Sequence, residues 1–336
     1  MIISNKPQIN ISCPTNGRMW LICLCVLLCI IQSSMSDGGQ SLVIALSALF
    51  SALIIELLLT WRSSGSVKVL DGSAAATALL LSVMLPNQLH PVYAGLGAAF
   101  AIVVVKYSFG GLGSNWLNPA LGGWLFIRFS WPSAFKKSIE ASSVSVSELV
   151  ISPNAGAIDG SVTDFLNNSV FSAFGVQMPL GYIDLLFNSN PGIITDRGLF
   201  ILLIGTILIT AKGINRGWIP LAFLAVYGFL IRLAGDLSGE LWNGDVLYGI
   251  FSGGTIAAAF IIAAEPSSSA KLKPGILLSI VIAAVLSWFF RYKCMEYAGC
   301  FIALALTNCL TPVIRLAEEK IFLSGNNRHK FQENFL

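Results

Sequence analysis

Residues 105–120 read VKYSFGGLGSNWLNPA, a loop rich in glycine and asparagine between two strongly apolar segments. Both flanking segments are apolar enough to cross a membrane, and hydrocarbon offers no partners for free backbone N–H and C=O groups. An irregular segment at membrane depth must therefore be buried in protein or border a site. The stretch predicts a helical membrane protein with a structured loop at a functional position.

The composition assigns the whole chain to the same class. Of its 336 residues, 55% are hydrophobic and only 11% are charged, whereas soluble domains carry about 25% charged residues. The net charge is +3, and no run of Lys or Arg forms a basic stripe. A nucleic-acid partner is therefore not expected, and the chain is predicted to be an integral membrane protein.

Ten segments are candidates for membrane spans, because a spanning helix needs about 20 apolar residues and about 17 is a lower limit for an unshielded one. They are 19–35, 41–60, 72–88, 91–107, 117–132, 198–212, 217–234, 246–264, 274–290 and 296–315. The segments 117–132 and 198–212 are short, so nine helices are the alternative. The predicted fold is all-α, with about ten transmembrane helices.

The basic residues support the count of ten. With a cytoplasmic N-terminus, the inner side collects Lys6, Arg18, Arg62, Lys68, Lys106, Lys212, Arg216, Lys271, Lys273, Arg315, Lys320, Arg328 and Lys330. This bias predicts a multi-pass membrane protein with both termini in the cytoplasm. Residues 18–36 also resemble a secretory signal peptide, but the charge pattern needs an uncleaved first helix.

Two stretches repeat one another. Residues 72–86, GSAAATALLLSVMLP, match 253–266, GGTIAAAFIIAAEP, and each is followed by a helix that ends in a base and a tyrosine. The offset is five helices, so the two halves run in opposite directions, as in inverted-topology repeats. We predict an N-terminal tail and first five-helix repeat at 1–132, an extracytoplasmic loop at 133–197, a second repeat at 198–317 and a cytoplasmic tail at 318–336.

Small and polar residues mark the candidate sites. Ser252, Gly253 and Gly254 can bind an anion at a helix start or pack closely against a neighbouring helix. Asp71 can cap the helix that follows it or act as a ligand, and capping is favoured. Glu56, in the second span, is a functional candidate as an intramembrane carboxylate. It can bind a cation, face a partner's basic group or extend to the aqueous border, and the last is favoured.

The loop that follows residue 107 has the strongest chemistry. Gly111 and Gly113, with Gly110, free the backbone, while Asn115 and Asn118 supply amide donors and acceptors. Pro119 fits the first turn of a helix, so Asn118 is also a candidate N-cap. We predict a loop that borders a cofactor or electron-transfer site, against the alternative of a tight connection. The seven cysteines and two histidines show no metal-ligand spacing, so no metal is predicted, unless one is shared with another subunit.

Three motifs in order resemble a known family. DGSAAATALLLSVMLP at 71–86, KYSFGGLGSNWLNPALGGWLF at 106–126 and FSGGTIAAAFIIAAEPSSS at 251–269 look like the RnfD subunits of Rnf ion-translocating electron transport complexes, which are related to the NqrB subunits of sodium-pumping NADH:quinone reductases. The resemblance covers about residues 15–320. It implies an FMN joined through its phosphate to a threonine, and partner subunits that move electrons between ferredoxin and NAD while Na⁺ or H⁺ crosses the membrane.

The resemblance also implies where the flavin is attached. The outer loop contains AIDGSVTDFLNNS at 157–169, in which Asp159, Gly160, Ser161 and Thr163 match the family pattern. Thr163 is then the candidate for the ester, Ser161 is second, and Asp159 is a recognition residue for the enzyme that attaches the flavin. Val162 and a shorter spacing depart from the pattern, and a plain Asp-Gly turn is the alternative. A second, non-covalent flavin also fits the family.

Two functions from different classes follow. The first is a flavin-carrying electron-transfer subunit of an ion-translocating oxidoreductase. The second is a secondary transporter or channel for a small polar solute, because inverted repeats with breaks near the membrane midplane are a general transporter plan. In both cases the isolated chain contains no predicted catalytic residue.

Overall fold

The structure is a computed structural model of the chain. It describes residues 15–64, 71–108, 110–111, 115, 117–140, 165, 168–169, 186, 192–213, 216–234, 244–266 and 268–324. Within these residues the fold is helical, and the one β-bridge, between Pro86 and Ile193, is isolated. The predicted all-α class is therefore confirmed.

The first half contains long apolar helices and one helix that changes type. Its elements are α1 (Thr15–Ser36), α2 (Gln40–Ser64), α3 (Ser73–Val83), α4 (Pro91–Phe100), the π-helix η2 (Ala101–Tyr107), α5 (Pro119–Ser130) and α6 (Pro132–Glu140). Proline stands at the start of α4 and of α5, where its missing N–H and fixed φ suit the first turn. The helix α6 lies in the predicted outer loop, and the sequence did not predict it as a helix of the fold.

The second half is interrupted more often. Its elements are α10 (Ile194–Arg197), α11 (Leu199–Ala211), α12 (Trp218–Ala234), α13 (Val246–Phe251), α14 (Thr255–Ala257), η4 (Ala258–Ile262), α15 (Lys273–Trp288), η5 (Phe289–Lys293) and α16 (Gly299–Ser324). The predicted span 246–264 is broken at 252–254, between α13 and α14. This break places two glycines with left-handed backbone, Gly253 and Gly254, inside the bundle.

Each predicted span coincides with one or more helices of the described chain, but their lengths differ. Four helical stretches are long and apolar enough to cross a membrane by themselves, namely Asn16–Ser36, Gln40–Trp61, Lys273–Lys293 and Gly299–Glu318. Shorter apolar helices include Ser73–Val83, Pro91–Tyr107, Leu199–Ala211 and Trp218–Leu233. The chain is thus an integral membrane protein, and the number of ten crossings remains a prediction.

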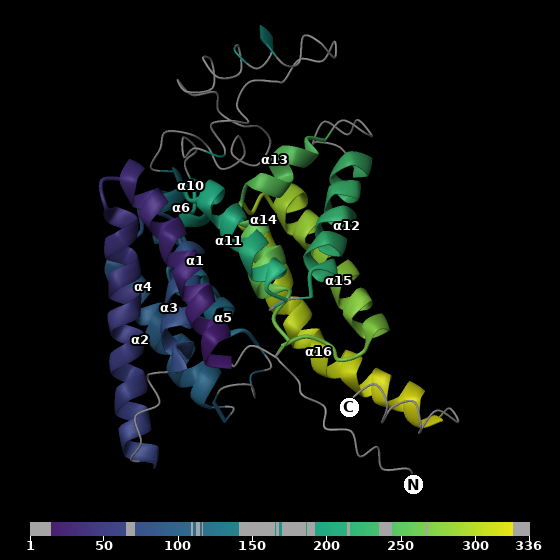
Figure 1. The fold of residues 1–336 in the computed structure, drawn as a ribbon, viewed down its shortest axis with the longest axis horizontal. Helices are drawn as coiled ribbons and strands as arrows, with labels where there is room; N and C mark the ends of the chain where they lie inside the picture. Colours follow the sequence, from purple (N-terminus) through teal and green to yellow (C-terminus); the bar gives the residue numbers. More distant parts are fainter. Residues whose placement is uncertain are drawn as a thin grey trace.

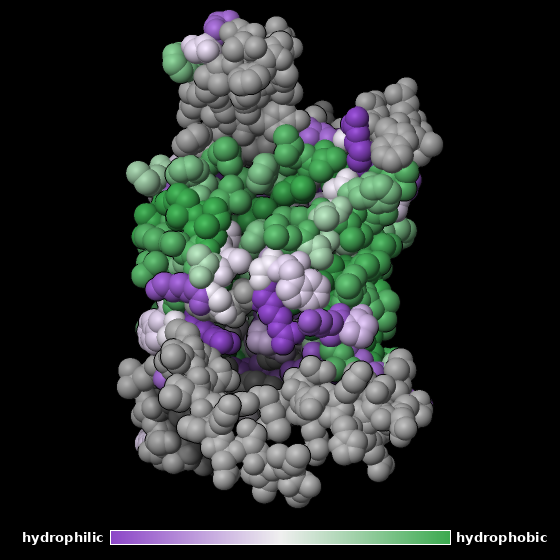
Figure 2. Space-filling view, turned by 45° about the vertical axis from the view of Figure 1, so that its right-hand side comes forward, coloured by the Kyte–Doolittle hydropathy of each residue, from purple (hydrophilic) through white to green (hydrophobic). Residues whose placement is uncertain are grey.

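The surface has the pattern that a bilayer requires. On the face shown in Figure 2, apolar residues form a band across the middle of the molecule, and hydrophilic residues gather along its lower edge. Many large apolar side chains of the outer helices are exposed, for example Phe50 at 68% and Leu221 at 62%. A soluble monomer rarely exposes so large an apolar surface, so lipid or partner subunits must cover the band.

The helices of the two halves lie side by side (Figure 1). In the interface α1 packs on α11, and small residues allow the close approach. A Cβ atom at Gly198 would overlap the carbonyl oxygen of Cys29, and one at Gly205 would lie 2.9 Å from Cβ of Cys25. Cys25 and Cys29 of α1 are thus small packing residues at this contact.

The matched helices α3 and α14 both contact the segment that precedes α11. The C-terminal end of α3 contacts the segment before α11, because Ile194 N donates to Leu85 O at 3.0 Å. The N-terminal end of α14 contacts the same segment, because Gly254 N donates to Asp196 Oδ1 at 2.9 Å. The end of α3 and the start of α14 therefore lie near one another, and the inverted direction of the two halves remains a prediction.

Candidate functional site

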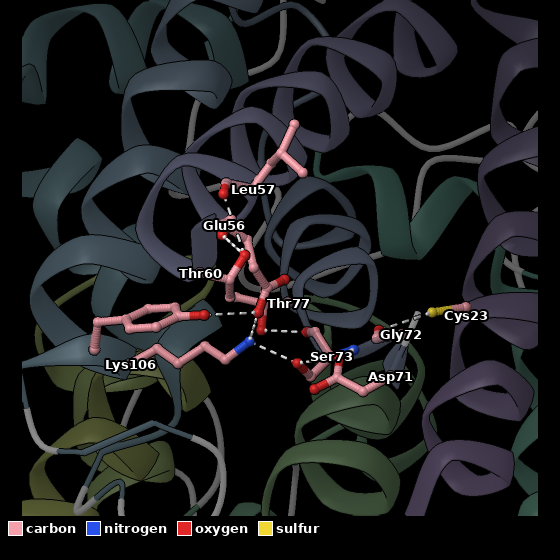
Figure 3. A network of polar contacts seen from close by, with 10 residues as sticks. Cys23, Glu56, Leu57, Thr60, Asp71, Gly72, Ser73, Thr77 and Lys106 are labelled. Atoms are coloured by element: carbon pink, nitrogen blue, oxygen red, sulfur yellow. Dashed lines mark hydrogen bonds and ion pairs between the residues drawn. The ribbon is translucent and has the colours of Figure 1, made fainter. Parts of the chain in front are cut away.

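A buried ion pair lies at the end of η2 in the first half (Figure 3). Lys106 Nζ lies 2.5 Å from Glu56 Oε1 on α2 and 2.5 Å from Ser73 Oγ at the start of α3. The side chains of Lys106 and Glu56 are only 3% and 1% exposed. The hydroxyl of Tyr107 also donates to Glu56 Oε1, at 3.4 Å. We call Glu56, Ser73, Lys106 and Tyr107 the lysine cluster.

The turn before α3 fixes the position of Ser73. Gly72 has a φ of 74°, in the left-handed region that glycine adopts without steric cost. The carboxylate of Asp71 accepts from Ser73 N at 2.9 Å and from Ser73 Oγ at 2.8 Å. Asp71 thus satisfies a free N–H at the start of α3, as the favoured capping interpretation predicted.

The preference for Glu56 at the aqueous border was wrong. Glu56 is buried, and its cation is Lys106 of the same chain. The sequence placed Lys106 among the loop charges, whereas the wider turn of η2 directs it into the bundle. Glu56 Oε2 is also buried and has no hydrogen-bond partner among the described residues. Such an unsatisfied buried oxygen costs about 1–3 kcal/mol, which makes it a candidate ligand atom.

The second half contains an equivalent cluster around Arg291 in η5. Arg291 is 2% exposed; its Nη1 donates to Ser252 O at 3.0 Å and its Nη2 donates to Ser252 Oγ at 2.6 Å. In both halves, therefore, a base from a π-helical turn binds a serine next to a glycine with left-handed backbone. We call Ser252, Gly253, Gly254, Arg291 and Asp196 the arginine cluster.

Aromatic rings surround the guanidinium of Arg291. Its Cζ atom lies 5.6 Å from the ring centroid of Tyr248, 5.8 Å from that of Tyr292 and 5.6 Å from that of Tyr297. Cations over aromatic faces are stabilised by the ring quadrupole, most strongly where water is excluded. The arginine is thus held as a fixed, buried charge.

Asp196 fills the glycine turn at the break between α13 and α14. Its Oδ2 accepts from Gly253 N at 3.0 Å and its Oδ1 accepts from Gly254 N at 2.9 Å. The two glycines have φ values of 66° and 72°, so that successive N–H groups form a concave anion site. The anion at Ser252–Gly254 is thus the chain's own carboxylate. Cofactor binding by these residues remains a prediction, and it would require Asp196 to move.

The protonation of Asp196 reflects opposing effects. Burial raises the pKa of the Asp196 carboxyl above its ordinary value, while the hydrogen bonds from Tyr297 and the two glycines, and the charge of Arg291, lower it. The hydroxyl of Tyr297 donates to Asp196 Oδ2 at 2.6 Å. Tyr297 and Asp196 thus connect the start of α16, the break before α14 and the segment before α11.

The predicted loop lies at the other end of α3 from this turn, because Lys106 binds the start of α3, whereas Ile194 and Thr195, next to Asp196, bind its end. Asn118 caps α5, accepting from Ala120 N at 2.8 Å, and its Nδ2 donates to Glu265 Oε2 at 2.5 Å. The N-cap interpretation of Asn118 is therefore confirmed. The same residue joins the two halves of the chain, which the sequence did not predict.

The remaining predicted residues divide into two groups. Asn115 is buried, and its Oδ1 has no hydrogen-bond partner among the described residues; Gly111 has a φ of 92° and open space where a Cβ would lie. Gly113 and the predicted flavin segment, with Asp159, Gly160, Ser161 and Thr163, lie outside the described residues.

An apolar pocket of about 420 Å³ lies between α4, η2 and α5. It is lined by Phe, Val, Leu and Gly side chains, and Ser130 is the one polar residue in its lining. Ligand pockets for polar molecules combine an apolar wall with several placed polar groups. This pocket therefore suits a lipid chain or an apolar side chain better than a polar solute.

Sequence reasoning marked the two bases but missed the contacts that the fold makes around them. The repeat marked Lys106 and Arg291 as equivalent, which was the available signal. Asp196 lies 57 residues from Gly253 and Tyr297 lies 101 residues from Asp196. Neither pairing leaves a local pattern in the sequence, and neither does the contact of Asn118 with Glu265.

The apolar helices, and a basic residue buried beside a glycine turn in each half, define a helical membrane protein. The chain belongs to the NQR2, RnfD, RnfE family, whose model matches residues 2–322. The family that its motifs resembled is thereby confirmed.

Relatives match over almost the full chain. The chain is 25% identical over 312 residues to the D subunit of the proton-translocating ferredoxin:NAD(+) oxidoreductase complex of Clostridium ljungdahlii, covering 93% of this chain and 92% of the relative. It is 26% identical over 326 residues to the Na(+)-translocating counterpart of Acetobacterium woodii, covering 96% and 95%. It is 29% identical over 350 residues to the D subunit of the ion-translocating oxidoreductase complex of Aeromonas hydrophila, covering 95% and 98%.

Proposed function

We propose that this chain is the RnfD membrane subunit of an Rnf-type ion-translocating ferredoxin:NAD oxidoreductase complex. In this role it carries FMN and relays electrons while Na⁺ or H⁺ crosses the bacterial inner membrane. Its partners are the other membrane and peripheral subunits of the complex. Both chain termini face the cytoplasm in this proposal, in keeping with the distribution of basic residues.

One observation carries the proposal: the D subunits of such complexes match this chain at 25–29% identity over more than nine tenths of its length. The order of the three motifs supports it, because they include the glycine-asparagine loop, the most specific part of the resemblance. The alternative of a solute transporter gains no support from the described residues, whose pocket between α4 and α5 is apolar.

The proposed cofactor is FMN, esterified through its phosphate to Thr163. The ester forms with loss of one water between the phosphate and the threonine hydroxyl, and the bound flavin supplies one- or two-electron redox chemistry. A second, non-covalent flavin would need an open polar site. The turn at Ser252–Gly254 does not fit its phosphate in this structure, because Asp196 already accepts the N–H groups of both glycines.

The described residues have a positioning role in this function. Each buried cluster joins helices of its own half, and Asn118 and Arg128 on α5 bind Glu265 and Glu296 of the second half. A frame tied at both ends of α5 keeps the distances between redox groups constant. Electron transfer is steeply sensitive to such distances, so a rigid frame suits a relay.

The cofactor assignment is tested by mass spectrometry of the intact chain expressed with its native flavin-attaching enzyme. We expect a mass increment of one FMN less one water, and ultraviolet-excited fluorescence of the denatured band. Thr163→Ala should abolish both, while Ser161→Ala is the matched control and should retain both. Fluorescence that persists in Thr163→Ala and is lost in Ser161→Ala would move the ester to Ser161.

The reaction class is tested with the purified complex. We expect a yellow sample whose flavin spectrum bleaches on reduction, and ferredoxin-driven reduction of NAD that generates an ion gradient in vesicles. A colourless chain that passes a small polar solute across vesicles would instead establish the transporter alternative. A yellow sample with a flavin spectrum and a colourless chain exclude one another.

A further inference from the structure

Three basic residues come together at one end of the second half. Arg216 lies just before α12, Lys271 lies in the turn before α15, and Arg315 lies near the end of α16. The charges of Arg315 and Arg216 both act on Lys271, so the fold gathers bases from three separate segments of the chain. We call Arg216, Lys271 and Arg315 the basic triad.

Hydrogen bonds fix the segments that carry two of these bases. Arg315 Nη2 donates to Ser269 O at 2.6 Å, which holds the guanidinium against the turn that contains Lys271. Glu318, three residues after Arg315, accepts from Leu272 N at 3.2 Å and from Lys271 N at 3.4 Å. The end of α16 and the start of α15 therefore form one connected surface, and the Glu318 carboxylate is used to hold it together.

The charge of this surface is not balanced by the chain. Within the described residues neither Arg216 nor Lys271 forms a salt bridge. Burial lowers the pKa of the Lys271 amine, and the charges of Arg315 and Arg216 lower it further, while Glu318 raises it. Lys271 Nζ donates to Pro266 O at 3.3 Å, and an ammonium has three N–H groups to give. Like charges held together repel one another, so an anion bound between them would stabilise the surface.

Exposed apolar side chains lie next to the same bases. They are Trp218 and Leu221 on α12, Leu277 and Leu278 on α15, and Leu316 on α16. Tryptophan is typical of the border between the hydrocarbon and the aqueous phase. Hydrophilic residues gather along the lower edge of the apolar band (Figure 2), on the side of the molecule where α16 ends (Figure 1). The basic triad therefore lies at a membrane border, with apolar surface beside it.

This combination favours one kind of ligand over two others. A small soluble anion would use the bases and leave the leucines uncovered. An acidic surface of a water-soluble protein would do the same, because it carries no apolar chains to place beside them. A phospholipid with a negative headgroup matches both parts of the surface, since its phosphate is anionic and its acyl chains are apolar.

We propose that the basic triad binds the phosphate of an anionic phospholipid, whose acyl chains lie against the exposed leucines of α12 and α15. An arginine can donate two parallel hydrogen bonds to phosphate oxygens, and a lysine acts as a compact point charge. Basic pockets between helices at the cytoplasmic side are known to recognise anionic headgroups, and this end is cytoplasmic in the orientation proposed above. The inference goes beyond the proposed function, because lipid binding needs neither a flavin nor an electron donor.

Native mass spectrometry of the purified full chain in detergent tests this proposal. The chain is titrated with phosphatidylglycerol and, separately, with phosphatidylcholine of the same acyl chains, and the lipid adducts give a Kd for each. We expect one phosphatidylglycerol to bind at least about tenfold more tightly than phosphatidylcholine. Raising the ionic strength should weaken this binding, because charges at a membrane border are screened by salt.

The double variant Arg216→Gln with Lys271→Gln should weaken phosphatidylglycerol binding at least about fivefold and leave phosphatidylcholine binding unchanged. The matched control is Lys136→Gln with Lys137→Gln, which removes two exposed bases of α6 and should change the Kd less than about twofold. Should the first double variant not fold, Lys271→Gln and Lys137→Gln make the same comparison with one base each.

Inorganic phosphate, added at the concentration of the lipid, should not compete with phosphatidylglycerol, because it has no acyl chains. Equal competition would reduce the site to a phosphate site and overturn the lipid assignment. Equal Kd values for the wild type and the triad variant would overturn it too, as would an equal loss in the α6 control. A triad variant that keeps its lipid but no longer holds the peripheral subunits of the complex would identify a protein interface instead.

The test is independent of the proposed electron-transfer function. A chain without flavin, or a complex without ferredoxin:NAD activity, would contradict that function and leave the lipid site in place. An active complex whose D subunit shows no preference for phosphatidylglycerol would retain the function and remove the lipid site.

Discussion

Removing the Asp196 carboxylate tests how much a buried hydrogen-bond acceptor of the second half contributes to stability. Asp196 is 3% exposed and accepts three hydrogen bonds, from Gly253 N, Gly254 N and the Tyr297 hydroxyl. In Asp196→Ala these three donors lose their acceptor inside the protein. A buried donor left unsatisfied costs about 1–3 kcal/mol, and water entering the space that the side chain vacates will relieve part of this. We expect a loss of about 3–5 kcal/mol in the free energy of unfolding, near the low end of the sum of three such penalties.

A matched control is available in the same half. Asp245 caps α13 by accepting from Tyr248 N at 2.9 Å, so Asp245→Ala removes a cap worth about 1 kcal/mol. Both variants are compared by unfolding in mixed micelles with increasing SDS, followed by tryptophan fluorescence. Tyr297→Phe and the double variant complete a cycle, in which we expect a favourable coupling because the two side chains share one bond.

Equal losses in the free energy of unfolding for Asp196→Ala and Asp245→Ala would refute this expectation. That result would mean that the glycine turn keeps its shape without the carboxylate. A coupling of zero between Asp196 and Tyr297 would separately exclude the hydrogen bond between them.

Three further predictions concern the backbone, pH and topology. Gly254→Ala should lower the free energy of unfolding by about 2–4 kcal/mol through left-handed strain and overpacking, because its Cβ would lie 2.6 Å from Phe301 Cζ. The added Cβ of Gly111→Ala meets no atom within 4 Å, so this variant should lose only about 1 kcal/mol through strain. Equal unfolding midpoints of the two variants would contradict this. Because burial raises the pKa of Asp196 in the folded state, the folded protein holds the Asp196 proton more tightly than the unfolded chain does. The part of the stability linked to this proton is fully present below the unfolded pKa of about 4 and is lost as the pH rises through the folded pKa. Thermal scans from pH 4 upward should therefore show the Tm of the wild type falling relative to that of Asp196→Asn, and a relative rise would contradict this sign. Cys294 is exposed and should react with a membrane-impermeant maleimide in intact cells. Cys294→Ser is the control. Labelling that occurs only after lysis would reverse the proposed orientation.

The membrane class and the position of the helices could be predicted from the sequence. Apolar length and composition act locally, because hydrocarbon must be matched by about 20 apolar residues wherever a helix crosses it. The segments 41–60 and 274–290 thus coincide with α2 and α15. Local chemistry also identified the caps, since Asn118 before Pro119 satisfies helix N–H groups through its own side chain.

The π-helical turns could not be predicted from the sequence. A π-turn adds one residue to the helical register and leaves the sequence as apolar as before, so η2 and η5 look like ordinary helix ends. Their effect is to rotate Lys106 and Arg291 into the bundle. The sequence marked both bases as equivalent, but it counted Lys106 as a loop charge.

Hydropathy, turn residues and motifs act along the chain, so the sequence was enough to identify a helical membrane protein of this family. The pairing of the buried charges depends on the tertiary fold. Lys106 and Glu56 lie 50 residues apart, and Asp196 and Gly254 lie 58 residues apart. Such partners are chosen by helix packing, since a buried charge must find a counter-charge or donor wherever the fold brings one near. The glycine-asparagine loop at 105–120 thus begins with a lysine that belongs to the core of the first half.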